Sequence, residues 1–255
     1  GISAFDNECV WALKRIMTLA VAHILGGETP RVWSFIVTIF GDLARHDDRY
    51  ISSQTLNRLT AEIGVKPEAT RVALHRLRKE DWLESKKFGR ESHYRLTKKG
   101  RKLSREAAPR IYGPASDHSV MLSIYDPTSS APDGLRILSG MSLVETGPVD
   151  AMNIEIDQPL PKWMVDRLID VELQRAVLDF HRRLSDVAIA SDASALDRMV
   201  VRLSIVHEWR RIILRLPVFP DQVLEKAIQL HDLRQTVQGL LSSLSDVSLD
   251  MIMDV

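Results

Sequence analysis

The side chains with the clearest chemistry in this sequence are basic, and they recur along one face of a helix predicted over residues 67–79. Arginine suits the recognition of nucleic acid because its forked guanidinium can donate to both O6 and N7 of guanine. Leu74 and Leu77 have the spacing of an inward face, which leaves the basic side chains outside. The candidate DNA contacts on this helix are Glu68, Thr70, Arg71, Val72, His75, Arg76 and Lys79.

Two runs of alternating apolar and polar residues follow, over 82–87 and 91–96, with Gly89 between them. This pattern predicts a β-hairpin with Tyr94 among its core positions. Basic residues crowd the tip, where they could reach the DNA backbone or the minor groove. The candidate contacts on the hairpin are Lys86, Lys87, Arg90 and His93.

The residues before the basic helix predict the elements that hold it in place. An apolar stripe over 32–43 indicates a helix whose exposed end includes Asp42. Ser52 is placed to cap a second helix, Gly64 to end it and Pro67 to begin the third. A short helix, a tight turn, a basic third helix and a hairpin are the parts of a winged helix-turn-helix that reads double-stranded DNA.

This predicted DNA-binding domain, residues 31–112, coincides with a change in charge along the chain. The whole chain has 34 Lys and Arg and 34 Asp and Glu. Residues 31–113 hold 19 basic and 10 acidic residues, a net charge of +9, whereas residues 114–255 have a net charge of −8. The neutral total therefore hides a basic segment that can meet phosphates.

The other parts of the chain make α+β the predicted fold class. Residues 1–30 hold an N-terminal helix that ends at Gly26 and Gly27. Residues 113–161 are rich in Pro, Gly and Ser, with short β-like runs. Residues 162–255 carry stripes typical of a helical bundle, with helices expected over 165–184, 196–215 and 221–244.

The sequence offers little for catalysis. The strand-like run that ends at Asp126 resembles the first strand of small ferredoxin-like nucleases, but a metal site needs several oxygen ligands. A glycine-rich phosphate loop, a zinc motif and a nucleophile elbow are all missing. We therefore predict no enzyme, no metal and no cofactor. The alternatives are a metal-dependent nuclease and a winged-helix module that binds protein, which would lack the steep salt dependence of DNA binding.

Cysteine usage and hydropathy bear on the compartment. Cys9 is the single cysteine, so an intrachain disulfide is impossible, which suits the cytoplasm. The apolar run over 16–27 is too short to cross a bilayer. We predict a cytoplasmic protein without a membrane segment.

Three stretches resemble the PaaX family of bacterial repressors: residues 33–42, residues 71–83 with 94–100, and residues 206–211. The resemblance implies a homodimeric repressor of aromatic-acid catabolism, such as that of phenylacetate, which an aryl-CoA thioester releases from its operator. It also implies a ferredoxin-like middle domain over residues 113–161 and an effector and dimerisation domain over 162–255. The chain departs from the family after Pro217, where the usual Asp-Pro and a later Leu-Pro-x-x-Trp are missing.

His207 and Arg210 fall on the apolar stripe of the helix predicted over 196–215. A charged side chain on a buried stripe is costly unless it is paired. One interpretation is a satisfied pair with Glu208 or with a carboxylate on a neighbouring helix. The other is an anion pocket for the phosphates or thioester of an acyl-CoA. The candidate effector contacts are His207, Trp209, Arg210 and Arg211.

Overall fold

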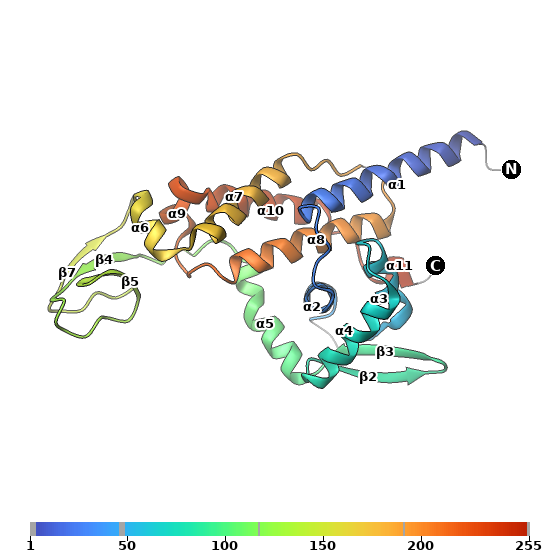
Figure 1. Cartoon of the computed structure of the whole chain (residues 1–255), viewed down its shortest axis with the longest axis horizontal. Helices are drawn as coiled ribbons and strands as arrows, with labels where there is room; N and C mark the ends of the chain where they lie inside the picture. The colour runs from blue at the N-terminus through green and yellow to red at the C-terminus, as the bar shows by residue number, and fades with distance from the viewer. Residues whose placement is uncertain (1–3, 46–48, 117, 191, 254–255) are drawn as a thin grey trace. The chain divides into compact units, whose positions relative to one another are not determined.

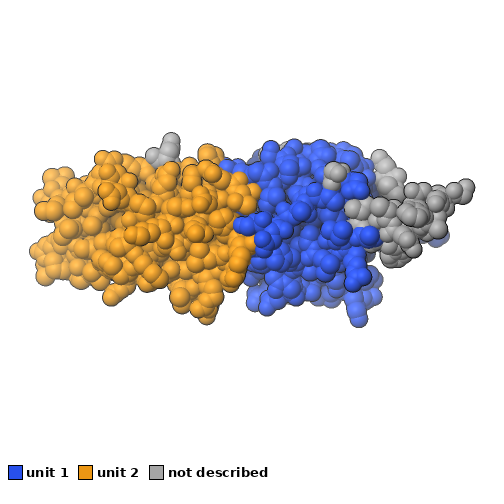
Figure 2. All heavy atoms as spheres, turned by 90° about the horizontal axis from the view of Figure 1, so that it is seen from above, with its two compact units in different colours: residues 1–113, 183–211, 237–255 blue, residues 114–182, 212–236 orange. Residues whose placement is uncertain are grey.

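The computed structural model (Figure 1) describes residues 4–45, 49–116, 118–190 and 192–253. Helices and two antiparallel sheets give the predicted α+β class. The chain forms two compact units, coloured blue and orange in Figure 2. Unit 1 comprises residues 1–113, 183–211 and 237–255, and unit 2 comprises residues 114–182 and 212–236. None of the helices in the described ranges is long and apolar enough to cross a membrane.

Local signals in the sequence set the helix ends in the first half of unit 1. The Ser52 hydroxyl accepts a hydrogen bond from the Thr55 amide at 3.0 Å, as a capping residue should. Gly64 has a φ of +79°, which glycine adopts without strain, and Pro67 lies in the first turn of its helix. These helices are α1 (Ala4–Ile24), α2 (Val32–Leu43), α3 (Ser53–Ala61), α4 (Pro67–Lys79) and α5 (Lys98–Tyr112).

A three-stranded sheet lies beside α3 and α4 in unit 1. Its strands are β1 (Ile51–Ser52), β2 (Leu83–Phe88) and β3 (Glu91–Leu96), in the order β1-β3-β2. The predicted hairpin is present, with β2 and β3 in register from Leu83 opposite Leu96 to Phe88 opposite Glu91. Tyr94, expected in the core, is only half-buried.

The core of unit 1 joins residues that are far apart in the sequence. Phe35, Ile39 and Phe40 of α2 are 0% exposed, as are Leu56 and Leu59 of α3. The unit also includes most of α8 (Ala195–Ile213), the last part of α10 (Leu230–Ser243) and α11 (Asp250–Met253). The apolar side of α2 therefore packs in the core of the same unit that contains α8.

Unit 2 contains a four-stranded antiparallel sheet in the order β5-β6-β4-β7. In a ferredoxin-like unit, helices connect the first strand to the second and the third to the fourth. Both corresponding connections here, residues 125–134 and 145–151, lack a helix. The ferredoxin-like arrangement is therefore not confirmed. The strands are β4 (Met121–Ile124), β5 (Leu135–Leu138), β6 (Met141–Val144) and β7 (Met152–Glu155).

Two helices predicted as continuous are each divided. The stripe over 165–184 forms α6 (Lys162–Leu168) and α7 (Val171–Ser185), because Asp170 accepts a hydrogen bond from the Leu173 amide and starts a new helix. The stripe over 221–244 forms α9 (Asp221–Ile228) and α10, because Gln229 has a left-handed φ of +52°. A periodic apolar pattern continues across such breaks, so it does not reveal them.

Candidate nucleic-acid interface

Helix α4 presents most of the predicted DNA contacts to solvent. Ala73, Leu74 and Leu77 are buried against the core of unit 1, which orients the opposite face outward. Val72 is 70% exposed, a high value for an apolar side chain. The exposed side chains of α4 include Glu68, Arg71, Val72, His75, Arg76, Arg78 and Lys79.

Thr70 differs from the other candidates on α4. Its side chain is fully buried, and its hydroxyl lies 2.8 Å from the Thr60 hydroxyl of α3. This contact joins the two helices on either side of the turn. Thr70 therefore has a structural role and is not part of the exposed surface of α4.

Arg76 is held by two neighbours. Its guanidinium carbon lies 4.7 Å from the centre of the Trp33 ring, on α2. Its Nε donates to Oε1 of Glu80 at 2.7 Å. The sequence placed Arg76 on the exposed face but gave no sign of the aromatic partner, because Trp33 lies 43 positions earlier in the chain.

The tip of the β2–β3 hairpin is exposed, with Gly89 at a φ of +62° in the turn. The Phe88 ring packs edge-on against the rings of His93 and Tyr50 and so supports the tip. Its centroid lies 4.8 Å from that of His93 and 5.7 Å from that of Tyr50. The Lys86 ammonium lies 5.2 Å from the centre of the Phe88 ring. Lys86, Lys87 and Arg90 are exposed, and His93 is half-buried.

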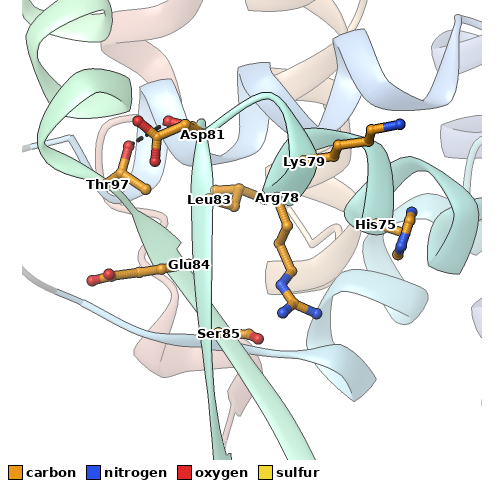
Figure 3. Close-up of a pocket in the computed structure, with 8 residues that line it drawn as sticks. All are labelled: His75, Arg78, Lys79, Asp81, Leu83, Glu84, Ser85 and Thr97. Atoms are coloured by element: carbon orange, nitrogen blue, oxygen red, sulfur yellow. Dashed lines mark hydrogen bonds between the residues drawn. The ribbon is translucent and has the colours of Figure 1, made fainter.

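A hollow of about 690 Å³ lies between the end of α4 and strand β2 (Figure 3). Arg78 and Ser85 point to one side of β2, and Glu84 points to the other. Glu84 is engaged there by Arg95, whose Nε donates to Oε1 at 2.5 Å. The hollow is lined by His75, Arg78, Lys79, Asp81, Leu83, Glu84, Ser85 and Thr97. Arg78, which was not among the predicted contacts, thus lines the hollow from the α4 side.

The four predicted effector residues lie on α8, and three of them join α8 to other helices of unit 1. The Thr38 hydroxyl of α2 lies 3.2 Å from Nδ1 of His207. Arg210 donates from Nη2 to the carbonyl and hydroxyl of Ser34, at 3.1 and 2.8 Å. The Trp209 indole donates to the carbonyl of Ile111 at 2.8 Å. Arg211, by contrast, pairs within α8 with Glu208 at 2.9 Å.

Burial controls the charge of this group. Burial, with the nearby cations Arg210 and Arg211, lowers the pKa of His207 to about 3, so its ring is neutral at pH 7. Burial also lowers the pKa of Arg210. The Nε of Arg210 is buried with no hydrogen-bond partner among the described residues. One of the two interpretations paired His207 and Arg210 with a carboxylate; the structure shows neutral oxygens of Thr38 and Ser34 as their partners instead.

At the other end of α2 from Ser34, the buried carboxylate of Asp42 also joins α2 to α8. Asp42 accepts from Nε and Nη2 of Arg202 at 2.7 and 2.9 Å, and from the Tyr112 hydroxyl at 2.8 Å. The Asp42 side chain is 0% exposed, so the prediction that it lies at an exposed helix end is wrong. Burial, together with the Asp42 charge, raises the pKa of the Tyr112 phenol, which therefore stays protonated and donates.

Asp126, the carboxylate considered for a nuclease, closes a turn. Its Oδ1 accepts from the amide and the hydroxyl of Thr128 at 2.8 and 2.7 Å. Aspartate commonly bonds the backbone two residues on in this way. Within the described ranges, no three His, Cys, Asp or Glu side chains are grouped so that they could hold a metal ion.

Comparison with known proteins connects this geometry to a family. The family described as PaaX-like protein matches residues 31–100. The transcriptional repressor PaaX of Escherichia coli (strain K12) is 24% identical over 259 residues, which span 86% of this chain and 82% of that protein. A solved structure, the uncharacterized protein Rv0674 from Mycobacterium tuberculosis, matches with a TM-score of 0.45 and 17% identity, covering 86% of this chain and 97% of that one. The resemblance predicted from the sequence is confirmed.

Proposed function

We propose that this chain, which is similar to PaaX-like proteins, is a transcriptional repressor whose residues 31–112 bind double-stranded DNA as a winged helix-turn-helix. The observation that carries the proposal is the position of the exposed cations. In residues 31–112 most of them lie on α4, on α5 and at the tip of the β2–β3 hairpin, and α4 and this hairpin follow one another in the chain. Such elements are the ones that a winged helix presents to DNA.

The order of elements supports this fold assignment. In the proposal, α3 and α4 form the helix-turn-helix, joined by the tight turn at Gly64, and α4 is the recognition helix. In the same proposal the β2–β3 hairpin, part of the sheet with the order β1-β3-β2, is the wing. Arg71, His75 and Arg76 would read base edges in the major groove, beside Glu68 and Val72. Lys79, Lys86, Lys87, Arg90 and His93 would contact the backbone or the minor groove.

Arg71 provides the test of this assignment. Operators would first be selected from random duplex DNA with the unaltered protein. Arg71→Ala is expected to lower affinity for the selected operator by about 10- to 100-fold, because a bidentate base contact is lost. The measurement is fluorescence anisotropy with operator and scrambled duplexes. Arg175→Ala, an exposed arginine on α7, is the matched control and should change neither affinity. Equal operator affinities for Arg71→Ala and the unaltered protein would contradict the assignment.

We also propose that the repressor acts as a homodimer. One recognition helix contacts few base pairs, and two-fold regulators bind half-sites about 34–36 Å apart. In the proposal, the segment over residues 114–255, which has a net negative charge, lies away from DNA and mediates the contact between the two copies. We expect operators selected from random duplex DNA to contain two inverted half-sites at this spacing.

An aryl-CoA thioester is the proposed signal, and aromatic-acid catabolism is the proposed pathway class. The support is Arg210, a half-buried guanidinium that bonds neutral oxygens and keeps an unpaired Nε among the described residues. In the proposal, the exposed Arg211 of the same helix adds a second cation for an anion that bears an apolar group.

Thermal unfolding tests the effector proposal. A ligand that binds only the folded chain at about 100 times its dissociation constant adds about 2.7 kcal/mol of stability, so the melting temperature should rise. A panel of acyl-CoA thioesters would be compared with free coenzyme A. Arg210→Met should reduce the rise relative to its own ligand-free melting temperature. The proposal fails if no aryl-CoA raises the melting temperature of the unaltered protein.

A further inference from the structure

The segment Trp33–Asp42 of α2 is one of the stretches that carry the family resemblance, and the proposed DNA contacts do not include it. The structure shows contacts on two sides of this helix. Ser34, Thr38 and Asp42 bond residues of α8. Trp33 instead contacts the recognition helix α4, through the guanidinium of Arg76.

The contacts of Arg76 restrict where its guanidinium can lie. The Trp33 ring lies 4.7 Å from the guanidinium carbon, and Glu80 engages Nε at 2.7 Å. A free arginine samples many rotamers, and a planar group that is already oriented loses less entropy when it binds. The bond to Glu80 uses Nε, and neither terminal nitrogen of Arg76 has a hydrogen-bond partner within the described ranges. Those two nitrogens can still donate to a base.

Trp33 is itself well placed for such a role. It is half-buried in the first turn of α2, and its neighbour Ser34 is held by Arg210. Phe35, two residues after Trp33 in the same helix, is buried in the core with 0% exposure. The backbone that carries the Trp33 ring is therefore held in place by the contacts of the neighbouring residues Ser34 and Phe35.

We propose that Trp33, together with Glu80, is a positioning residue that orients Arg76 for base recognition and so contributes to operator specificity. The proposal rests on the proposed DNA-binding function. It predicts an effect on operator affinity without an effect on binding to phosphates, because phosphate contacts carry no sequence information. Specificity is the difference between those two affinities.

A double-mutant cycle on Trp33 and Arg76 tests the proposal with operator and scrambled duplexes. Trp33→Leu is expected to lower operator affinity roughly 5-fold, the scale of a partly exposed cation–π contact, and to leave affinity for the scrambled duplex unchanged. In the Arg76→Ala background the same change should have no further effect on operator affinity. Trp33→Phe retains an aromatic face and should keep most of the operator affinity. Trp163→Leu, a change at a 48% exposed tryptophan on α6, is the matched control.

Glu80→Gln provides a second variant on a partly exposed side chain whose loss should not affect folding. Removing its charge should raise affinity for any duplex, but the ratio of operator to scrambled affinity should fall. Additive effects of Trp33→Leu and Arg76→Ala, or an unchanged ratio in Glu80→Gln, would overturn the proposal. If the unaltered protein binds no duplex selectively, the proposed function fails instead.

Discussion

Asp42→Ala is expected to lower the free energy of unfolding by about 3–5 kcal/mol, the cost of breaking a buried ion pair from one side. The Asp42 carboxylate is fully buried and bonds both Arg202 and the Tyr112 hydroxyl. Without it, the Arg202 guanidinium loses its carboxylate partner in a side chain that is only 17% exposed. The Tyr112 phenol also loses the acceptor that holds α5 on α2.

Urea unfolding followed by circular dichroism at pH 7 would measure this loss. The matched control is Asp246→Ala, because Asp246 also pairs with an arginine of α8, Arg198, at 2.7 Å. The Asp246 side chain is 64% exposed, so solvent screens its ion pair and the loss of stability should be much smaller than for Asp42→Ala. A loss for Asp42→Ala no larger than that of the control would contradict the expectation.

Asp42 also shows what the sequence could not reveal. Its position at the end of an apolar stripe predicted an exposed side chain, since charged residues are seldom buried without a partner. The partner, Arg202, lies 160 positions later on α8. A local pattern reports which face of a helix is apolar. It does not report that a polar stripe, here Ser34, Thr38 and Asp42, will meet polar groups of another helix.

Elements set by local chemistry were predictable. The cap at Ser52 and the glycine turn at Gly64 each depend on residues within a few positions. The exposed face of α4 followed from its apolar spacing for the same reason. The breaks at Asp170 and Gln229 were missed, because they depend on backbone turns that leave the apolar spacing intact.

The sequence predicts which residues make up the candidate site, but it does not predict how their side chains are arranged. The basic residues of α4 and the hairpin tip are visible in the sequence because charge clusters there. Which cations are engaged is set by distant contacts, such as Trp33 on Arg76, that the sequence does not show. The same limit applies to α8, where Arg210 meets Ser34 of α2 rather than a nearby carboxylate.

DNA affinity is expected to fall about 1000-fold or more between 50 and 200 mM salt if the two copies of a dimer together contact six or more phosphates. The exposed cations of α4 and the hairpin tip are numerous enough for this. Lys86 and Lys87 lie on adjacent positions of β2 at the exposed end of the hairpin. They would act on the backbone, so their loss should weaken binding to every duplex and not operator preference.

The measurement is the slope of the logarithm of affinity against the logarithm of salt concentration, for operator and scrambled duplexes. Lys86→Ala combined with Lys87→Ala should make the slope shallower by about 2 for each copy that contacts DNA, because each lost phosphate contact removes about one unit. The same two changes at Lys162 and Lys226, exposed lysines of unit 2, keep the number of charges equal and should leave the slope unaltered. An identical slope for the two double variants would exclude the hairpin tip from the phosphate contacts. A flat slope for the unaltered protein would favour a winged-helix module that binds protein rather than DNA.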